Sequence, residues 1–296
     1  MPQTLDLTAA TIDYEDTGGS GPVVVFVHGL LVDGTLWRKV VSRLDGCRCV
    51  VPTLPLGSHR VPARDRSALT PVGVADMLAE FIERLELTDV TIVANDTGGA
   101  ITQLLLTRRP ERIASVVLTP CDAFENFLPP AFKPLQWLAK ARLLGAFLQG
   151  ARIPAVRRSP LAYGLLTKRP VPAEILEGWV RPALSNRGVR GDAQYFTRHI
   201  DKRLTLDAAA KLGTFDRPVL LAWSAEDRFF KIGFAERLAA VFPNARLERI
   251  PDAYTFLPED RPDVLAEQIT AIIEECSSPS TSGTPRPTSG RSTTAA

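Results

Sequence analysis

The chain has 296 residues, of which 45% are hydrophobic, and its formal net charge is +2. This length allows one domain with a large core and an inserted smaller unit, and the small net charge implies no general affinity for polyanions. Nucleic-acid binding is poorly supported, since the chain has no recognition motif and no aromatic residues interleaved with its basic ones. No apolar stretch approaches the roughly 18 residues of a membrane span. The first residues lack a basic segment followed by an apolar one, so we expect a cytoplasmic protein without stable membrane insertion.

The N-terminal part contains three candidate strands. Residues 23–27 form an unbroken apolar run that ends at His28-Gly29, as in a central parallel strand. Residues 48–51 form the second strand, and the loop after it contains His59. Residues 90–93 form the third, a β-branched run that precedes a helical pattern at 100–107.

Between this third strand and its helix lies Ala94-Asn-Asp-Thr-Gly-Gly99. Small residues two positions before and two positions after Asp96 allow a sharp turn from strand to helix, with the spacing of a nucleophile elbow. Such a turn exposes Asp96 beside the first N–H groups of the helix, which stabilise negative charge. The alternative is that Asp96 only caps the helix.

Residues 122–205 form an insertion that we expect to be mostly helical. Irregular backbone is expected at 124–134, a helix at 135–148, short helices at 160–166 and 173–180, and a last helix at 191–203. The insertion has 14 Lys and Arg residues against 6 Asp and Glu residues. That excess suits an anionic substrate or an acidic surface, or only a solvated helical face. Five aromatic residues are candidates for an apolar substrate wall or for internal packing: Phe124, Phe127, Trp137, Trp179 and Phe196.

After the insertion, strands and helices alternate again. A buried strand follows Arg217 and leads to Glu226 and Asp227, a last strand covers 245–250, and a helix covers 260–274. Residues 276–296 are rich in Ser, Thr, Pro and Gly, and we expect a disordered tail there. The whole pattern predicts an α/β fold with a mostly parallel central sheet and helices on both faces.

The cysteines, Cys47, Cys49, Cys121 and Cys276, are not spaced as pairs of metal ligands. Cys47 and Cys49 flank one residue near a strand, so their side chains share a face and are poorly placed for a disulfide. We therefore expect no metal or other cofactor, and free thiols in a reducing compartment.

The His-Gly turn after an early strand, the elbow after a middle strand and the acid after a late strand together resemble the α/β-hydrolase fold. Asp at the elbow resembles the branch that contains haloalkane dehalogenases and epoxide hydrolases. The resemblance covers 1–121 and 206–275, with 122–205 as a helical cap. It implies that an Asp attacks carbon to give an alkyl-enzyme ester, which a His-activated water then hydrolyses.

Carried onto this sequence, the resemblance makes Asp96 the nucleophile and Asp227 the supporting acid, with Glu226 as a close alternative. The backbone N–H groups of Leu30 and Thr97 would be the oxyanion donors. Four further residues would shape the two turns that carry these groups, namely His28, Gly29, Gly98 and Gly99.

The expected catalytic His is missing. In the loop Pro251-Asp-Ala-Tyr-Thr-Phe-Leu-Pro258, alignment on Phe256-Leu257 puts Thr255 at its position. A threonine hydroxyl does not titrate near neutral pH and cannot act as the general base. His59 is a candidate substitute because it follows the carboxyl end of a strand, although a loop histidine is the more ordinary interpretation, as it is for His199.

Other differences bear on the substrate. The related dehalogenases hold halide with a Trp after the nucleophile and an Asn after the His-Gly pair, whereas this chain has Thr97 and Leu30 there. Epoxide hydrolases of this type use cap tyrosines to protonate the opening ring, and Tyr163 and Tyr195 are the candidates, with Tyr254 as a third. The epoxide hypothesis therefore fits slightly better than dehalogenation.

The sequence thus predicts a hydrolase that acts on a small, mostly apolar electrophile, with no nucleic-acid partner. One alternative is a non-catalytic descendant that keeps the pocket for ligand binding or regulation. Another is a hydrolase of esters or C–C bonds, which usually has Ser at the elbow. The oligomeric state is left open.

Overall fold

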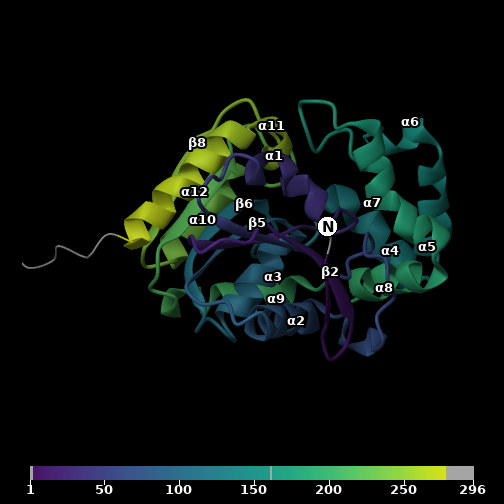
Figure 1. Cartoon of the computed structure of the whole chain (residues 1–296). Helices are drawn as coiled ribbons and strands as arrows, with labels where there is room; N and C mark the ends of the chain where they lie inside the picture. Colours follow the sequence, from purple (N-terminus) through teal and green to yellow (C-terminus); the bar gives the residue numbers. More distant parts are fainter. Residues whose placement is uncertain (1–2, 161, 278–296) are drawn as a thin grey trace, which may run out of the picture.

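A computed structural model describes residues 3–160 and 162–277 of the chain. Its centre is an eight-stranded sheet with the order β1-β2-β4-β3-β5-β6-β7-β8 (Figure 1). Strands β3 to β8 run parallel to one another, whereas β1 and β2 form an antiparallel edge, with β2 antiparallel to β4, that the sequence pattern did not predict. The strands are β1 (Gln3–Asp6), β2 (Thr11–Asp16), β3 (Val23–Val27), β4 (Arg48–Thr53), β5 (Val90–Asp96), β6 (Ile113–Cys121), β7 (Val219–Ser224) and β8 (Ala245–Ile250).

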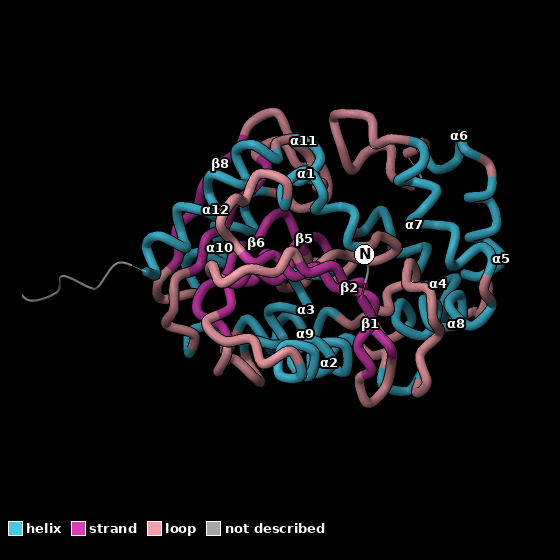
Figure 2. The backbone as a smooth tube through the Cα atoms, viewed as in Figure 1, coloured by secondary structure: helices cyan, strands magenta, loops and turns pink. Residues whose placement is uncertain are grey.

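Helices cover both faces of the sheet, as predicted (Figure 2). One face packs against α2 (Pro71–Arg84), α3 (Thr97–Leu106), α9 (Lys202–Ala209) and α10 (Ile232–Val241). The other packs against α1 (Arg38–Val41), α11 (Leu257–Asp260) and α12 (Pro262–Ser277). Short 3-10 turns complete the core: η1 (Gly34–Trp37), η2 (Arg66–Ala68) and η5 (Leu212–Thr214).

The central strands are apolar along their whole length because both of their faces are covered. Every residue of β7 is buried, as are all residues of β5 before Asp96. Strands of this kind occur where helices lie on both sides of a parallel sheet. The carboxyl ends of β3, β5, β6 and β7 therefore meet at one edge, and that edge carries the site described below.

The cap lies beside the carboxyl edge of the sheet and consists of α4 (Lys133–Lys140), α5 (Leu144–Leu148), α6 (Pro154–Arg157), α7 (Ala173–Ser185) and α8 (Arg187–Arg198), with the 3-10 turns η3 (Pro130–Phe132) and η4 (Gln149–Arg152). The single helix expected at 135–148 is wrong. Arg142 adopts a left-handed φ of 62°, and the N–H groups of Arg142 and Leu143 bond to the carbonyls of Ala139 and Leu138. This is a Schellman ending, which separates α4 from α5.

Three other cap predictions need correction. The described residues of 160–166 form turns and not a helix. Helix α7 continues through Pro182, whose carbonyl accepts from the N–H of Asn186. The helix expected at 191–203 is two helices, because the Asp201 carboxylate accepts from the N–H of Arg203 and starts α9 anew.

The C-terminal helix is longer than predicted. Helix α12 extends to Ser277, so Cys276 belongs to the helix and not to a disordered tail. The tail prediction for 278–296 lies outside the described residues. Helix α9 crosses the expected boundary between residues 205 and 206 and packs against α3. Within the described residues, the helices are all too short or too polar to span a membrane.

Candidate active site

Asp96 is the last residue of β5 and immediately precedes α3. Its backbone has φ 54° and ψ −130°, a conformation that a non-glycine residue adopts only when its surroundings impose it. Space for this turn depends on glycines. A Cβ at Gly98 would overlap the carbonyl oxygens of Val27 and His28, and one at Gly99 would overlap the side chain of Cys121. The side chain of Asp96 accepts no capping bond from α3, so the capping alternative receives no support.

The backbone N–H groups of Leu30 and Thr97 lie near the Asp96 carboxylate and favour its charged form. These are the two N–H groups that the sequence predicted beside it. Gly29 passes so close that a Cβ there would overlap the carboxylate. Removal from water raises the pKa of Asp96 to about 7, the two N–H groups oppose that rise, and the negative charge of Asp227 adds to it.

Asp227 lies after β7 and is 5% exposed. Its Oδ1 accepts from the N–H groups of Phe229 and Phe230 at 2.7 and 2.6 Å, whereas its Oδ2 has no partner with full hydrogen-bond geometry. Burial raises the pKa of Asp227 to about 6, against the effect of these N–H groups and of the nearby Thr255 hydroxyl. An acid with one free oxygen therefore stands within electrostatic reach of Asp96.

Thr255 is fully buried beside Asp227, and its Oγ1 also lacks a partner with full hydrogen-bond geometry. A hydrogen bond from Asn95 holds the loop that carries Thr255. The Nδ2 group of Asn95, next to the candidate nucleophile, donates to the Thr255 carbonyl at 2.7 Å and to Thr119 Oγ1 at 2.8 Å. Position 255 therefore lies beside Asp227, as the alignment predicts, and it holds a hydroxyl in place of an imidazole.

His28 is buried in the turn after β3. Its Nε2 accepts from the N–H of Leu54 at 2.8 Å, so its Nδ1 carries the proton and donates to the Gly29 carbonyl at 2.8 Å. Desolvation lowers the pKa of His28 and favours this neutral form. Both ring nitrogens thus hold the turn that presents Leu30.

The structure does not bring His59 to Asp96. The His59 ring is 2% exposed, its Nδ1 accepts from the N–H of Gly57 at 3.2 Å, and its Nε2 lies 3.1 Å from Asp192 of α8. Asp192 also accepts from Arg66 at 2.6 Å. The substitute-base hypothesis for His59 is therefore wrong, because Nδ1 is bonded within its own loop and Nε2 is bonded to Asp192 of the cap. His199 is similarly occupied, with Nδ1 bonded to the Tyr195 carbonyl.

Glu226 is also corrected as a candidate acid. Its carboxylate lies 2.5 Å from Lys168 Nζ and accepts from the N–H of Asp252, and its side chain is half exposed. The Lys168 ammonium lowers the pKa of Glu226. The residue faces solvent, and its neighbour Asp227 faces the site.

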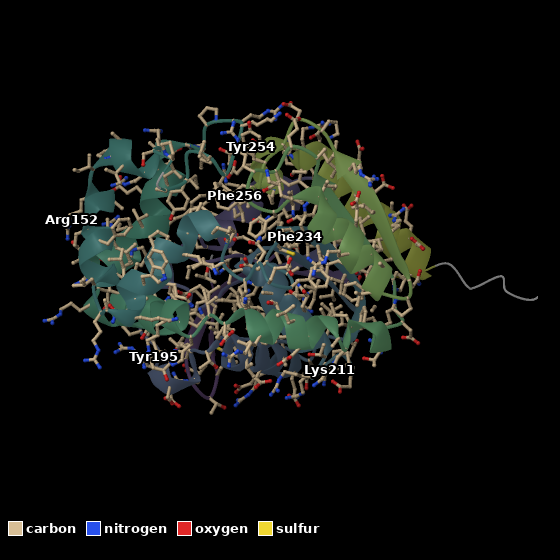
Figure 3. All side chains as sticks on the ribbon, turned by 180° about the vertical axis from the view of Figure 1, so that it is seen from behind. Arg152, Tyr195, Lys211, Phe234, Tyr254 and Phe256 are labelled. Carbon is tan, nitrogen blue, oxygen red and sulfur yellow. The ribbon has the colours of Figure 1, made fainter. Side chains whose placement is uncertain are left out.

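Of the three tyrosines, only Tyr163 lines the cavity beside Asp96 among the described residues. Its hydroxyl donates to the Leu31 carbonyl at 2.5 Å, and burial raises its pKa. Tyr195 packs against His199 and Arg198 at the edge of the cap, and Tyr254 packs beneath Arg228 near the molecular surface (Figure 3). Tyr195 and Tyr254 are therefore wrong as ring-protonating candidates.

A cavity of about 290 Å³ separates the elbow from the cap. Asp96 and Thr97 lie at its core side, and the cap side is apolar. The five aromatic residues proposed for its wall are absent from the described lining, and the aromatic lining residues are instead Phe132, Phe147 and Tyr163. Sequence pattern could not separate the two groups because both lie at helical spacing.

Asp122 is a residue that the sequence analysis missed. It follows β6 directly, is fully buried, and accepts from the Thr97 hydroxyl at 3.2 Å and from the N–H of Leu128 at 2.8 Å. Burial and the charge of Asp96 raise its pKa well above the ordinary value. The available signal was its position after a strand adjacent to β5, but the expected cap boundary placed it in the insertion.

Comparisons with known proteins agree with this geometry. The chain is 28% identical to haloalkane dehalogenase 2 of Mycobacterium tuberculosis, over 91% of this chain and 92% of the relative. It is 29% identical to a cis-3-alkyl-4-alkyloxetan-2-one decarboxylase of Xanthomonas campestris, over 92% and 96%. The solved structure of haloalkane dehalogenase DbeA from Bradyrhizobium elkani superposes with a TM-score of 0.79 at 18% identity, covering 94% of this chain and 98% of that one.

The family described as alpha/beta hydrolase fold matches residues 22–262, which include β3, the elbow, the cap and the Thr255 loop. The mostly parallel sheet and the sharp strand-to-helix turn at Asp96 are those that the sequence predicted for that fold. The chain belongs to the α/β-hydrolase fold family.

Proposed function

We propose that this hydrolase-type protein uses Asp96 to attack an electrophilic carbon of a small, mostly apolar substrate and forms an alkyl ester. The observation that carries the proposal is the position of the Asp96 carboxylate on a strained turn beside the cap cavity, with two backbone N–H groups directed at it. Preorganised donors of this kind contribute about 3 kcal/mol each when charge develops on the reacting group.

The first step needs only residues that the chain has. A carboxylate oxygen of Asp96 attacks carbon, and the bond from that carbon to halide or to epoxide oxygen breaks with its electron pair. Leu30 and Thr97 hold the other carboxylate oxygen and orient the attack. An epoxide oxygen needs a proton as it leaves, and the Tyr163 hydroxyl at the cavity wall is the candidate donor.

The second step, hydrolysis of the ester, lacks its usual base. Asp227 is our proposed substitute, because its Oδ2 lacks a fully formed hydrogen bond and its carboxylate lies beside Thr255, where the imidazole would be. Water attacks the ester carbonyl and gives a proton to Asp227. The bond between the carbonyl carbon and the alkoxy oxygen then breaks, Asp227 returns the proton to that oxygen as the alcohol leaves, and Asp96 releases the second proton of water to solvent. A carboxylate is a weaker base than imidazole, so this step would be slow.

A second candidate substrate avoids this slow step. One relative is named for a 2-oxetanone with two alkyl groups, a four-membered lactone. If Asp96 attacks the alkyl carbon of such a ring, the ring C–O bond breaks and a free carboxylate forms on the adjacent carbon. Loss of CO2 then leaves an electron pair that forms a C=C bond and expels Asp96 as carboxylate. No water and no base are consumed, which suits a site with Thr255 in place of His.

Three probes separate these candidates: a primary bromoalkane, a terminal epoxide and a cis-dialkyl 2-oxetanone. Each is incubated with the full chain while intact mass, halide, diol and alkene are recorded. The proposal expects one equivalent of bound alkyl group from the bromoalkane or epoxide, with slow release. If the lactone is the substrate, it gives alkene over many turnovers without a persistent adduct.

Asp96→Asn is the matched variant, because it keeps the shape of the side chain and removes the nucleophile. It should abolish adduct and alkene alike. Adduct or product that persists in Asp96→Asn contradicts the assignment of the nucleophile. Absence of any reaction with all three probes, in protein whose fold is intact by circular dichroism, favours the ligand-binding alternative.

A further inference from the structure

The cap carries an unusual combination of positive charge and exposed apolar side chains. Residues 126–173 contain eight Lys or Arg residues, and all 33 Asp and Glu residues of the chain lie elsewhere. Of the six large hydrophobic residues exposed in the described part of the chain, four fall in the same segment. They are Trp137 (65% exposed), Leu143 (53%), Phe147 (46%) and Ile153 (58%).

Trp137 and Phe147 lie on α4 and α5, and Leu143 and Ile153 immediately precede α5 and α6. These elements contact one another in sequence, α4 with α5, α5 with η4 and η4 with α6. On α4, Lys133, Trp137 and Lys140 are spaced four and three residues apart and form one stripe. Leu143 and Phe147 are four residues apart and form another. We call the exposed residues of α4 to α6 the outer cap surface. Figure 1 shows α5 and α6 at the end of the molecule remote from α12, and Figure 3 shows Arg152 at the same rim.

Most of the charge on this surface is not neutralised. Arg157 pairs with Glu177, and Lys168 with Glu226 and Asp252. By contrast, Lys140 and Arg142 form no ion pair with any described residue, and the same holds for Lys133 and Arg158. Unpaired cations next to exposed Trp, Leu, Phe and Ile are the composition of a surface that adsorbs to anionic lipid.

We infer that the outer cap surface binds peripherally to an anionic lipid bilayer. Its cations lie near lipid phosphates, and Trp137, Leu143, Phe147 and Ile153 enter the boundary between headgroups and acyl chains. A second copy of the chain is disfavoured as the occupant, because a two-fold contact would bring the same unpaired cations together. Nucleic acid is disfavoured as the occupant, because a phosphate backbone would not bury the exposed aliphatic side chains.

The same elements form the inner wall of the cavity. Phe147 lines the cavity and is also part of the outer cap surface, and Leu148 and Val156 line the cavity from α5 and α6. Adsorption of this surface would therefore bring the cavity next to the phase in which apolar molecules concentrate.

The test is sedimentation of the full chain with vesicles, read without any assay of activity. Vesicles of phosphatidylcholine with phosphatidylglycerol should bind the protein, pure phosphatidylcholine vesicles should bind it weakly, and high salt should release it. Lys140→Glu combined with Arg142→Glu should lower partitioning roughly tenfold or more, because each cation near such a surface contributes about fivefold. Leu143→Ser combined with Phe147→Ser should lower it at both low and high salt.

Two controls match these variants elsewhere on the molecule. Lys211→Glu removes an exposed cation of the core, and Leu206→Ser removes an exposed apolar side chain outside 126–173. Both should bind vesicles like the parent chain. The inference is wrong if the folded parent chain ignores anionic vesicles, or if the controls lose as much binding as the cap variants. It is also wrong if Leu143→Ser with Phe147→Ser instead converts a dimer to a monomer in light scattering.

Discussion

The carboxylate of Asp227 and the hydroxyl of Thr255 are buried next to each other, and each has an oxygen without a fully formed hydrogen bond. Buried polar atoms usually find partners, and their exceptions concentrate at functional sites. Two of the several unpartnered buried atoms in the described residues, Asp227 Oδ2 and Thr255 Oγ1, lie where the acid and the base of the proposed reaction would meet. In the proposed mechanism, Asp227 is therefore an acid beside the position of the missing base.

Thr255→His should supply the missing base. We expect little change in the rate at which Asp96 captures a bromoalkane, and a rise of roughly 100-fold in release of the alkyl group, the usual scale of general-base catalysis. Single-turnover mass spectrometry separates the two steps. Thr255→Gln, similar in bulk to His but without a titratable group, is the control, and an equal rise in that variant would contradict the expected role.

Asp227→Asn should slow release of the ester while it lets capture of the substrate by Asp96 begin at lower pH. The charge of Asp227 raises the pKa of Asp96, so its removal lowers that pKa and lets capture begin at lower pH. Release of the ester should slow if Asp227 is the base. The measurement is the pH profile of each step. Glu226→Gln is the matched control because it neutralises the adjacent carboxylate, which faces solvent. An unchanged release rate in Asp227→Asn would remove Asp227 from the mechanism.

Capture should depend on pH through Asp96 itself. The nucleophile is the carboxylate, and the pKa of Asp96 is raised to about 7, so the rate should increase up to that pH and level off above it. Stability should have the opposite slope. Between the ordinary Asp pKa near 4 and about 7 the folded state binds the extra proton, so the free energy of unfolding falls as pH rises. Asp96→Asn should flatten that fall, as measured by urea unfolding at several pH values.

Gly29→Ala should prevent capture. Its Cβ would overlap the Asp96 carboxylate, so the carboxylate or the turn that presents Leu30 must move. We expect a loss of at least about 100-fold in the capture rate, comparable to removing an oxyanion donor. Gly178→Ala provides the matched control, since a Cβ there meets nothing within 4 Å and a helical Ala is favoured by about 1 kcal/mol over Gly. An unchanged capture rate in a folded Gly29→Ala protein would contradict the close approach of Gly29 to the Asp96 carboxylate.

Asp192→Ala should weaken the attachment of the cap. Asp192 is fully buried and accepts from His59, Arg66 and the N–H of Ala63. Losing one partner of such a network typically costs about 3 kcal/mol, and limited proteolysis should then cleave the cap sooner. Asp207→Ala, at an exposed position of α9, should leave both stability and proteolysis nearly unchanged. Equal effects of the two variants would argue against a specific role for the buried network.

The parallel core could be predicted because buried central strands and the elbow leave strong local patterns. Asp96 could be predicted at the apex of a sharp turn in the same way, since Gly98 and Gly99 supply the space that such a turn needs. The edge strands β1 and β2 were missed because half-exposed strands show weaker periodicity. The choice between Glu226 and Asp227 depended on side-chain direction, which neighbouring residues in a loop do not encode. The roles of His59 and Asp122 depended on long-range partners, Asp192 and Thr97, which no local pattern specifies.

Asn95 fixes the main chain at the position where the imidazole is absent. Its amide ties the main chain at residue 255 to β6 through Thr119 and the Pro120 carbonyl, so the backbone position that a histidine would need does not rely on the side chain present there. The proposed site thus differs from one with a histidine at position 255 by one side chain on a main chain that Asn95 holds. The main chain at residue 255 is therefore held from β5 whichever side chain it carries, and a substitution at this position tests the side chain alone.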